Sequence, residues 1–357
     1  DCLLSRGLGD VYKRQALAYR GRTFLCHPDE TLLAAAIRQG VGLPYACKDG
    51  ACGSCKCRRL DGSVVMDSYQ PRALSEAEAA EGQILTCRAR PSTDVVLESR
   101  QVTETGGFPI KKMPTRVLSL ERRSHDVMVI NMQLPANDTL GYHAGQFVEF
   151  ILRDGSRRSY SMANAPHVQP EPGKPSIQLH VRHMPGGKFT DHVFGGMKEK
   201  EILRIEGPYG SFFLREDSAA PLIFLASGTG FAPLKAIIEH MQFKGITRPA
   251  VLYWGGRRPG DLYMSDWVEQ KCAEMPHLRF VPVVSDALPE DGWTGRTGFV
   301  HQAVLDDHPD LSGHQVYACG APIVVESAQR EFTARAGLLA DEFYADAFTS
   351  ERDKHMA

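Results

Sequence analysis

The spacing of four cysteines constrains this chain more than any other feature. Cys47, Cys52 and Cys55 are separated by four and then two residues, and Cys87 follows further along the chain. Small residues, including glycine, fill much of the space between the first three, so the backbone can curl tightly and bring several sulfurs to one centre. The pattern predicts a metal centre held by Cys47, Cys52, Cys55 and Cys87.

Three kinds of site use cysteines in this way: a [2Fe-2S] cluster, a zinc site and a disulfide framework. A gap of four followed by a gap of two is typical of cluster ligands, whereas zinc sites more often pair two gaps of two. The spacing favours the cluster, with zinc and disulfides as alternatives. Cys57 is also a soft ligand two residues beyond Cys55, but four ligands are already supplied, so we interpret it as a packed thiol.

The bulk properties limit the class of protein. A chain of 357 residues is long enough for two or three domains. The net charge of -2 and the lack of a basic block argue against nucleic acid as a partner, and no apolar run approaches the ~20 residues of a membrane span. Nine cysteines, five of them between Cys47 and Cys87, indicate a reducing compartment and a metal centre. We therefore expect a cytoplasmic protein without membrane insertion.

The first fifteen residues lack an initiating methionine, a signal-peptide core and any periodicity. We expect residues 1–15 to be a non-native or disordered leader outside the fold.

Residues 16–102 read as a small α+β domain around the cysteines. Two short extended runs on either side of Gly21 predict a hairpin. A helix is expected to follow, with Asp29 as its N-cap and Gly40 at its C-terminal end. Strands are expected at 56–60, 84–88 and 95–98, with Cys87 at a strand exit. This order resembles the β-grasp fold of plant-type ferredoxins. Residues 103–112 lack periodicity and are rich in glycine, which predicts a linker.

Residues 113–215 show strand alternation and read as an antiparallel β-barrel. Apolar and polar residues alternate over 127–134, which leads on to the string Arg158-Ser-Tyr160-Ser161. A guanidinium can fork onto phosphate oxygens, and a flat aromatic ring can cover a flat heterocycle. The string resembles the flavin motif of the ferredoxin–NADP reductase superfamily. The resemblance implies that Arg158 contacts a phosphate of FAD, Tyr160 the flavin ring and Ser161 its reactive edge.

A second phosphate site is predicted in the same domain. Gly186, Gly187 and Thr190 precede or open a helix expected over 190–197, and a helix start offers unpaired N–H groups and positive charge to anions. In the superfamily that the chain resembles, this segment holds the flavin pyrophosphate. We interpret the nearby His180 and His183 as structural.

Residues 216–350 read as a Rossmann-like domain with a parallel sheet, and residues 351–357 as a tail. The apolar run 222–226 leads into Gly228-Thr229-Gly230-Phe-Ala-Pro233 and then a helix over 234–243, an order that brings dinucleotide phosphates close to backbone. Pro233 replaces the third glycine of the usual fingerprint, as in the ferredoxin reductase superfamily. Further strands (251–254, 278–284, 315–319) alternate with helices (264–275, 300–306, 323–336), as in an α/β fold.

Three further contacts follow from the same resemblance. Cys319 and Gly320 are expected near the nicotinamide, although a buried strand thiol is an alternative for Cys319. Near the chain end Phe348 is expected at the flavin, with Asp346 or simple edge-strand packing as alternatives. Arg257 and Arg258 could accept a 2′-phosphate, but the surrounding string resembles NADH-using reductases, so we favour NADH, with NADPH possible.

The order of motifs predicts a multidomain oxidoreductase. A flavin can take a hydride and release single electrons, so cluster, FAD and NADH motifs together form an electron path. Residues 16–350 resemble CDP-6-deoxy-Δ3,4-glucoseen reductase-like proteins, which implies a deoxysugar dehydrase as electron acceptor, docking near Lys48 and Asp49. Alternatives are the reductase of an aromatic-ring oxygenase and a non-catalytic electron-transfer or sensing module. The groups nearest the chemistry would be Tyr160, Ser161 and Cys319.

Overall fold

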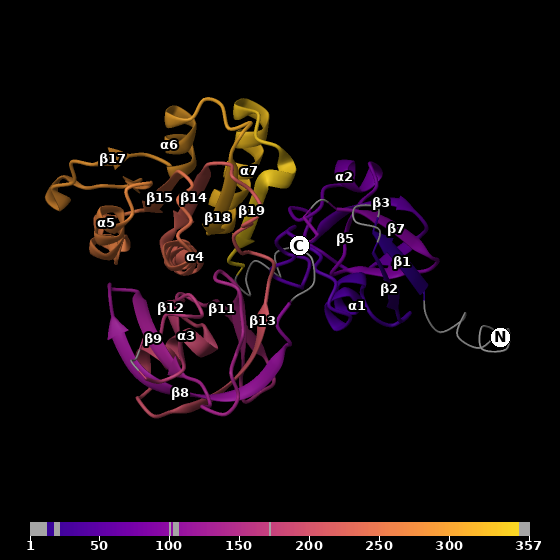
Figure 1. The fold of residues 1–357 in the computed structure, drawn as a ribbon, viewed down its shortest axis with the longest axis horizontal. Helices are drawn as coiled ribbons and strands as arrows, with labels where there is room; N and C mark the ends of the chain where they lie inside the picture. Colours follow the sequence, from indigo (N-terminus) through magenta and orange to yellow (C-terminus); the bar gives the residue numbers. More distant parts are fainter. Residues whose placement is uncertain (1–12, 18–21, 100, 103–106, 171–172, 350–357) are drawn as a thin grey trace. The chain divides into compact units, whose positions relative to one another are not determined.

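A computed structural model describes residues 13–17, 22–99, 101–102, 107–170 and 173–349 (Figure 1). The chain divides into two compact units, residues 1–107 with 347–357 and residues 108–346. The division falls inside the predicted linker at 103–112, although strand β8 begins at Lys111, so the last two residues of that linker were wrongly predicted. Within the described residues, no helix has both the length and the apolar character to cross a bilayer.

The first unit is built on a sheet with the order β2-β1-β7-β3-β5. Strand β1 (Lys13–Leu17) pairs antiparallel with β2 (Thr23–Cys26) and parallel with β7 (Val95–Glu98), which confirms the hairpin. The prediction that the fold begins at residue 16 was wrong, because Lys13 to Gln15 pair with β2. The predicted leader otherwise lies outside the described residues.

Helix α1 (Leu32–Arg38) packs on this sheet through alanine and leucine side chains. The prediction that Asp29 caps it was wrong, because the Thr31 hydroxyl accepts from the Ala34 N–H at 3.2 Å. The remaining elements of the unit are β3 (Lys56–Asp61), β4 (Val64–Met66), α2 (Glu76–Ala80), β5 (Gln83–Leu85) and β6 (Ala89–Pro91). Because β5 ends at Leu85, the predicted strand 84–88 is too long, and Cys87 lies in the turn between β5 and β6.

The second unit begins with an antiparallel sheet of order β11-β10-β13-β8-β9-β12. An isolated bridge between Met162 and Leu179 connects the segments at its two edges, so the sheet closes into a barrel. Its strands are β8 (Lys111–Arg122), β9 (Val127–Gln133), β10 (Phe147–Ile151), β11 (Arg157–Ser161), β12 (Ser176–Arg182) and β13 (Ile202–Tyr209). Helix α3 (Lys188–Gly195) buries Phe189 and Val193 in the apolar interior of the barrel.

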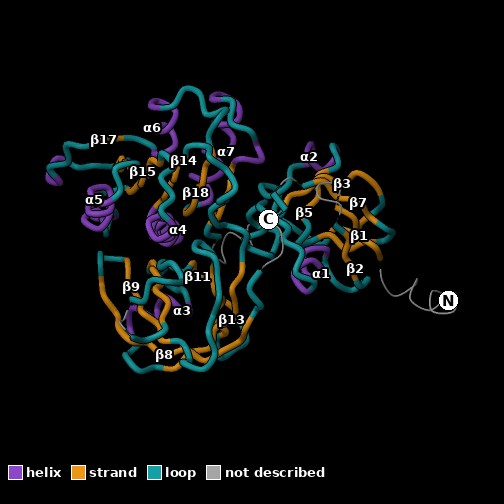
Figure 2. Tube along the Cα trace, in the orientation of Figure 1, coloured by secondary structure: helices purple, strands orange, loops and turns teal. Residues whose placement is uncertain are grey.

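The same unit continues into a sheet of order β17-β16-β15-β14-β18-β19. Its described pairings among β14, β15, β16, β17 and β18 are parallel, as the alternation of strands and helices predicted. Helices α4 and α5 lie on one face and α6 and α7 on the other (Figures 1 and 2). The strands are β14 (Leu222–Ser227), β15 (Ala250–Gly256), β16 (Leu278–Val284), β17 (Arg296–Thr297), β18 (Gln315–Gly320) and β19 (Phe343–Ala347). The helices are α4 (Phe231–Lys244), α5 (Ser265–Glu274), α6 (Val300–Asp307) and α7 (Pro322–Ala336).

Short 3-10 turns join these elements at Gly228–Gly230, Pro259–Asp261, Pro289–Asp291 and Ala340–Glu342. The strand order reverses between β14 and β18, since the chain runs from β14 outward to β17 and then returns to β18. Such a reversal leaves a crevice at the carboxyl ends of the two strands, which is where open α/β sheets bind ligands.

Candidate functional site

The cysteine loop has a backbone that positions its sulfurs. Lys48, Gly50 and Gly53 have left-handed backbone conformations, with φ of 64°, 80° and 77°. A Cβ on Gly50 would lie 2.8 Å from Arg88 Cγ, and a Cβ on Gly53 would lie 3.0 Å from the Ala73 carbonyl oxygen. Glycine is therefore required at both positions for conformation and for space.

The four predicted ligands come together as two pairs of sulfurs. Cys55 Sγ and Cys87 Sγ are 3.2 Å apart. A hydrogen bond from the Cys47 thiol lowers the pKa of Cys52 to about 6 and raises that of Cys47. The pairs are neighbours, because the charge of Cys52 also raises the pKa of Cys87.

This arrangement fits a two-iron cluster better than zinc. Four thiolates around one zinc ion at about 2.3 Å would all lie within about 4 Å of one another. Among the described residues, however, no three cysteine sulfurs lie within 4.8 Å of one another. Two close pairs suit two metal ions that take two thiolates each. The described cysteines are also all free of disulfides.

Cys57 lies on β3, two residues beyond Cys55. It is 2% exposed, and burial raises the pKa of its thiol to about 12. Ser99 is its hydrogen-bonding neighbour. This environment supports the interpretation of Cys57 as a packed thiol.

Strand β11 carries the predicted flavin motif. Its exposure alternates, and Arg158 and Tyr160 are both half-buried on one face of the strand. The Tyr160 ring packs 5.2 Å from the Phe189 ring, and burial raises the pKa of its hydroxyl. Arg157, on the other face, pairs with Glu149 at 2.8 Å and Glu206 at 2.7 Å. The two faces of β11 therefore carry arginines of different kinds: Arg157 forms ion pairs within the barrel, and Arg158 is the predicted ligand-binding residue.

The predicted pyrophosphate turn precedes helix α3, which begins two residues earlier than predicted. Gly186 has a φ of 85°, and open space lies where its Cβ would be. The start of α3 has no side-chain cap, and the first N–H groups of a helix have no partner within the helix. The Thr190 hydroxyl donates to the Met184 carbonyl at 2.9 Å, so Thr190 shapes the turn. The Gly186 N–H donates to the Asp191 carboxylate at 3.1 Å and the Gly187 N–H to the Met184 carbonyl at 2.8 Å, so an anion here would have to use the uncapped start of α3, and the predicted pyrophosphate site stays a prediction.

The dinucleotide turn packs directly against the end of β18. A Cβ on Gly230 would lie 2.1 Å from the Cys319 carbonyl oxygen, and a Cβ on Gly320 would lie 2.3 Å from the Ser227 carbonyl oxygen. Both glycines are therefore required for the close approach of β14 and β18. Thr229 is buried, and Pro233 lies in the first turn of α4. The turn and the Cys319–Gly320 pair thus share the crevice at the strand reversal.

A buried carboxylate connects the barrel to this crevice. Asp346 on β19 is 6% exposed and accepts from the Ser161 hydroxyl at 3.3 Å. The same carboxylate oxygen lies 3.9 Å from Cys319 Sγ, and burial, together with Asp346, raises the pKa of that thiol. The structure therefore brings Ser161, Cys319 and Asp346 together. Phe348 follows β19, and its predicted role stays a prediction.

Arg182 is a residue that sequence reasoning missed. It ends β12, and its Nη1 lies 3.2 Å from where a Cβ on Gly228 would be. Asp126 holds the guanidinium through Nε at 2.6 Å. In the sequence, Arg182 stands between His180 and His183, but an isolated arginine on a strand does not show that its side chain contacts another domain.

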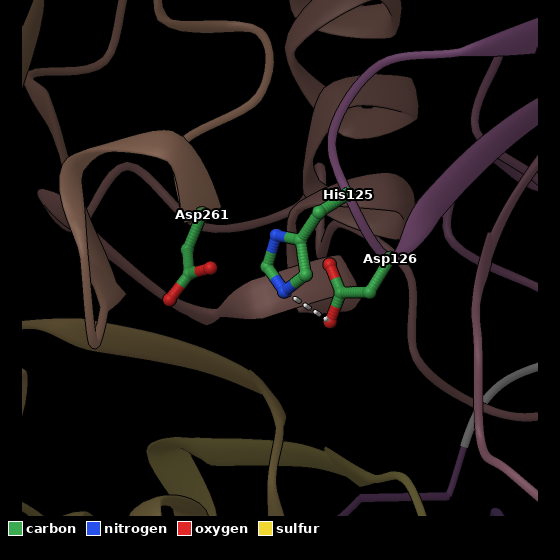
Figure 3. Close-up of side chains that lie close together, drawn as sticks. All are labelled: His125, Asp126 and Asp261. Atoms are coloured by element: carbon green, nitrogen blue, oxygen red, sulfur yellow. Dashed lines mark ion pairs between the residues drawn. The ribbon is translucent and has the colours of Figure 1, made fainter.

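Asp126 also belongs to a group of possible metal ligands with His125 and Asp261, whose side chains face one another in Figure 3. Asp126 already accepts from Arg182, and Asp261 accepts from the N–H groups of Arg257 and Arg258 at 2.8 and 3.0 Å. These contacts account for both carboxylates, so we interpret the group as a link between the β8–β9 hairpin and the 257–261 turn.

Three protein-family models match the chain in the order of its domains. They are a 2Fe-2S iron-sulfur cluster binding domain over residues 17–92, an oxidoreductase FAD-binding domain over 114–214 and an oxidoreductase NAD-binding domain over 224–330. With the geometry above, these matches define an oxidoreductase of the ferredoxin–NADP reductase type that carries a [2Fe-2S] cluster, FAD and NAD(P)H.

Full-length relatives narrow this class. The chain is 40% identical over 332 residues to CDP-6-deoxy-L-threo-D-glycero-4-hexulose-3-dehydrase reductase of Yersinia pestis, covering 93% of this chain and 97% of that protein. It is 34% identical to reductase component 2 of terephthalate 1,2-dioxygenase from Comamonas sp, covering 93% and 96%. The Amycolatopsis cytochrome P450 reductase GcoB has a similar structure, with a TM-score of 0.75 at 32% identity, covering 95% and 99% of the two chains. The chain belongs to the iron–sulfur flavoprotein reductases, which pass electrons from NAD(P)H through FAD and a [2Fe-2S] cluster to a partner.

Proposed function

We propose that this reductase uses NADH and supplies electrons to a deoxysugar dehydrase. The observation that carries the site assignment is the contact of Ser161 and Cys319 with one carboxylate, that of Asp346. It joins the end of the flavin strand to the crevice where the sheet reverses. The greater identity to the dehydrase reductase than to the dioxygenase component, 40% against 34%, supports the dehydrase as partner.

On the barrel side, the residues would hold and orient FAD. Arg158 would bind a phosphate, Tyr160 would cover one face of the flavin ring, and the Ser161 hydroxyl would hydrogen-bond the ring's reactive edge. The turn at Gly186 and Gly187 would receive the pyrophosphate at the start of α3. When bound, FAD supplies the step between two-electron hydride chemistry and one-electron cluster chemistry.

On the nucleotide side, the residues would place the nicotinamide beside Ser161. The Gly228–Gly230 turn would bind the dinucleotide phosphates, and Arg182 would add positive charge from the barrel. Gly320 would leave room for the ring at the end of β18. Cys319 would act as a neutral neighbour, because burial and Asp346 keep its thiol protonated.

The surroundings of Arg258 support NADH over NADPH. Its guanidinium is bound by both oxygens of Asp291, through Nε at 2.8 Å and Nη2 at 2.7 Å. Arg257 faces Asp286 at 3.4 Å. A 2′-phosphate would have to displace these carboxylates and accept their repulsion, whereas a ribose hydroxyl would not.

Steady-state reduction of ferricyanide with each nucleotide tests this preference. We expect a larger kcat/KM with NADH, and we expect Asp291→Asn to raise kcat/KM for NADPH about tenfold, since one charge-assisted contact of about 1.5 kcal/mol is freed. Asp310→Asn is a matched control, because within the described residues the carboxylate of Asp310 accepts from its own turn, at the Ser312 N–H. A larger kcat/KM with NADPH in the unmodified protein would reject the preference.

The partner is tested separately with purified acceptors. We expect cytochrome c turnover with NADH alone and reduction of a deoxysugar dehydrase at a rate above that of an oxygenase component. Faster reduction of the oxygenase component would make it the partner, and a lack of any NADH turnover in cofactor-loaded protein would favour the non-catalytic module. A cytoplasmic location fits the eight free cysteines of the described residues.

A further inference from the structure

A buried ion pair lies on helix α4, just behind the dinucleotide turn. Lys235 Nζ and Glu239 Oε1 are 2.6 Å apart, and the two residues are only 4% and 8% exposed. The Lys235 ammonium also lies 5.0 Å from the centre of the Trp267 ring. Burial lowers the pKa of Lys235, while the carboxylate of Glu239 acts in the opposite direction. None of the roles described above uses either residue.

Both members of the pair also bind the barrel. Lys235 Nζ donates to the Ala163 carbonyl at 3.0 Å, and Glu239 Oε2 accepts from the Ala165 N–H at 2.9 Å. Ala163 lies two residues beyond Ser161, the last residue of β11. The ion pair therefore binds the backbone of the segment that directly follows β11, the predicted flavin-binding strand.

The barrel fixes the same segment from its own side. The Asn164 side chain donates to the Val168 carbonyl at 2.7 Å and accepts from the Gln178 N–H at 2.7 Å. Residues 163–165 are therefore held by the barrel through Asn164 and by α4 through the two neighbouring backbones. The position of this segment therefore depends on both domains, so it couples the placement of one domain to that of the other.

Stability alone does not explain a buried ion pair here. Removing two charges from water has a large desolvation cost, and apolar residues of similar volume often replace such pairs without loss. The rest of the buried face of α4 is apolar, including Leu234, Ile237 and Ile238. What an apolar pair could not supply is one donor and one acceptor for the polar backbone of residues 163–165.

We propose that Lys235 and Glu239 form a positioning clamp that holds the nicotinamide-binding end of α4 in register with Ser161. This inference rests on the proposed hydride transfer between the two domains. Helix α4 follows the Gly228–Gly230 turn without a break, so a shift of the helix moves the turn with it. The clamp sets the placement of the nicotinamide ring, and the glycine turn and Arg182 hold the phosphates.

The test is a double variant, Lys235→Met with Glu239→Met, in the full-length protein loaded with its cofactors. It removes both charges and both cross-domain hydrogen bonds while keeping apolar volume. The saved desolvation of the two charges offsets part of the cost of leaving the Ala163 carbonyl and the Ala165 N–H unpaired, so we expect only a modest fall in Tm. We expect the rate of flavin reduction by NADH to fall at least tenfold. The long-wavelength charge-transfer absorbance between flavin and nicotinamide should weaken, while Kd for ADP-ribose, which lacks the nicotinamide, stays within twofold.

The matched control is Glu331→Met with Arg335→Met, another i,i+4 ion pair, at 2.9 Å on α7. It should leave the reduction rate and the charge-transfer band unchanged. A Lys235/Glu239 double variant with wild-type reduction rate and absorbance would overturn the clamp, as would equal weakening of ADP-ribose binding. If the double variant unfolds, two single variants decide: Glu239→Gln keeps an acceptor for Ala165 and should preserve the band and the reduction rate, whereas Glu239→Met removes the acceptor and should lower both. Equal bands and rates in these two variants would overturn the clamp. Absence of NADH turnover in the wild type would instead overturn the proposed function.

Discussion

The cysteine loop and the junction of Ser161, Cys319 and Asp346 assemble their side chains in opposite ways. Three of the four cysteines fall within nine residues, and left-handed backbone at Gly50 and Gly53 directs them. The junction draws its residues from strands β11, β18 and β19, with 185 positions between Ser161 and Asp346. A local turn therefore builds the first site, and the packing of two domains builds the second.

This difference predicts how each site fails. A substitution in the loop should remove its metal centre while the rest of the molecule stays folded. A substitution at the junction should disturb both the stability and the chemistry of the reductase unit, because the same contacts serve both.

The largest effect is expected from Cys52→Ser. Loss of one thiolate should prevent cluster assembly, so cytochrome c reduction with NADH should be abolished. Ferricyanide reduction should persist, because this acceptor can take electrons from the flavin. Visible absorbance and iron content measure the cluster directly.

Cys57→Ser is the matched control for that variant. Cys57 is buried on β3, so its replacement should cost some stability but leave the cluster and cytochrome c reduction in place. If Cys57→Ser lost the cluster and Cys52→Ser retained it, the ligand set would be wrong.

The second-largest effect is expected from Gly230→Ala, at the contact between β14 and β18 beside the junction. The new Cβ would meet the Cys319 carbonyl oxygen at 2.1 Å, and neither backbone can move without separating β14 from β18. We expect a loss of about 3 kcal/mol in the free energy of unfolding, together with weaker NADH binding. Denaturant unfolding and a Kd for NAD⁺ measure the two effects.

Gly260→Ala is the control, because nothing lies within 4 Å of its Cβ position and its φ is not left-handed. We expect a change within about 0.5 kcal/mol. The cluster absorbance should be unchanged in both glycine variants, since the loop is built locally. Equal stability of the two variants would contradict the close-packing argument.

The same contrast explains what the sequence could reveal. The clustering of the four cysteines was predictable because their spacing reports a local turn. The turn at Gly228 and Gly230 was predictable because a strand, a glycine turn and a helix follow one another in the sequence. The helix cap was misplaced at Asp29 because Asp29 and Thr31 are both good caps and only tertiary packing chose Thr31. Cys87 fell beyond its strand because β5 ends early, at Leu85.

Residues that make contacts between domains could hardly be predicted from the sequence. Asp346 was only an alternative to Phe348, since an acidic residue on a short strand does not reveal that it meets Ser161. Glu239 lies on a helix that was predicted and Arg182 at the end of a strand that was not, and the partners of both come from elements far along the chain. Periodicity predicts which face of an element is buried, but it does not predict what that face meets.

The smallest effect concerns His180, which links the barrel to the nucleotide domain. His180 is 4% exposed, and its Nδ1 lies 2.8 Å from the Tyr263 hydroxyl. Burial, with Lys235 and Arg123 nearby, holds the pKa of His180 well below its ordinary 6.5. The unfolded chain therefore binds more protons than the native protein below about pH 6.5, so His180 lowers stability as the pH falls through that value.

His180→Gln should flatten this dependence. We expect the slope of unfolding free energy against pH, between about pH 6.5 and 5, to decrease by up to about 1.4 kcal/mol per pH unit, the effect of one proton. Above that range the two slopes should coincide. Tyr263→Phe removes the hydrogen bond but keeps the buried ring, so it should retain the wild-type slope. An unchanged slope in His180→Gln would mean that the ring takes up its proton without unfolding, and the contact between the two domains would then tolerate a buried charge, unlike the tightly packed strands at Gly230.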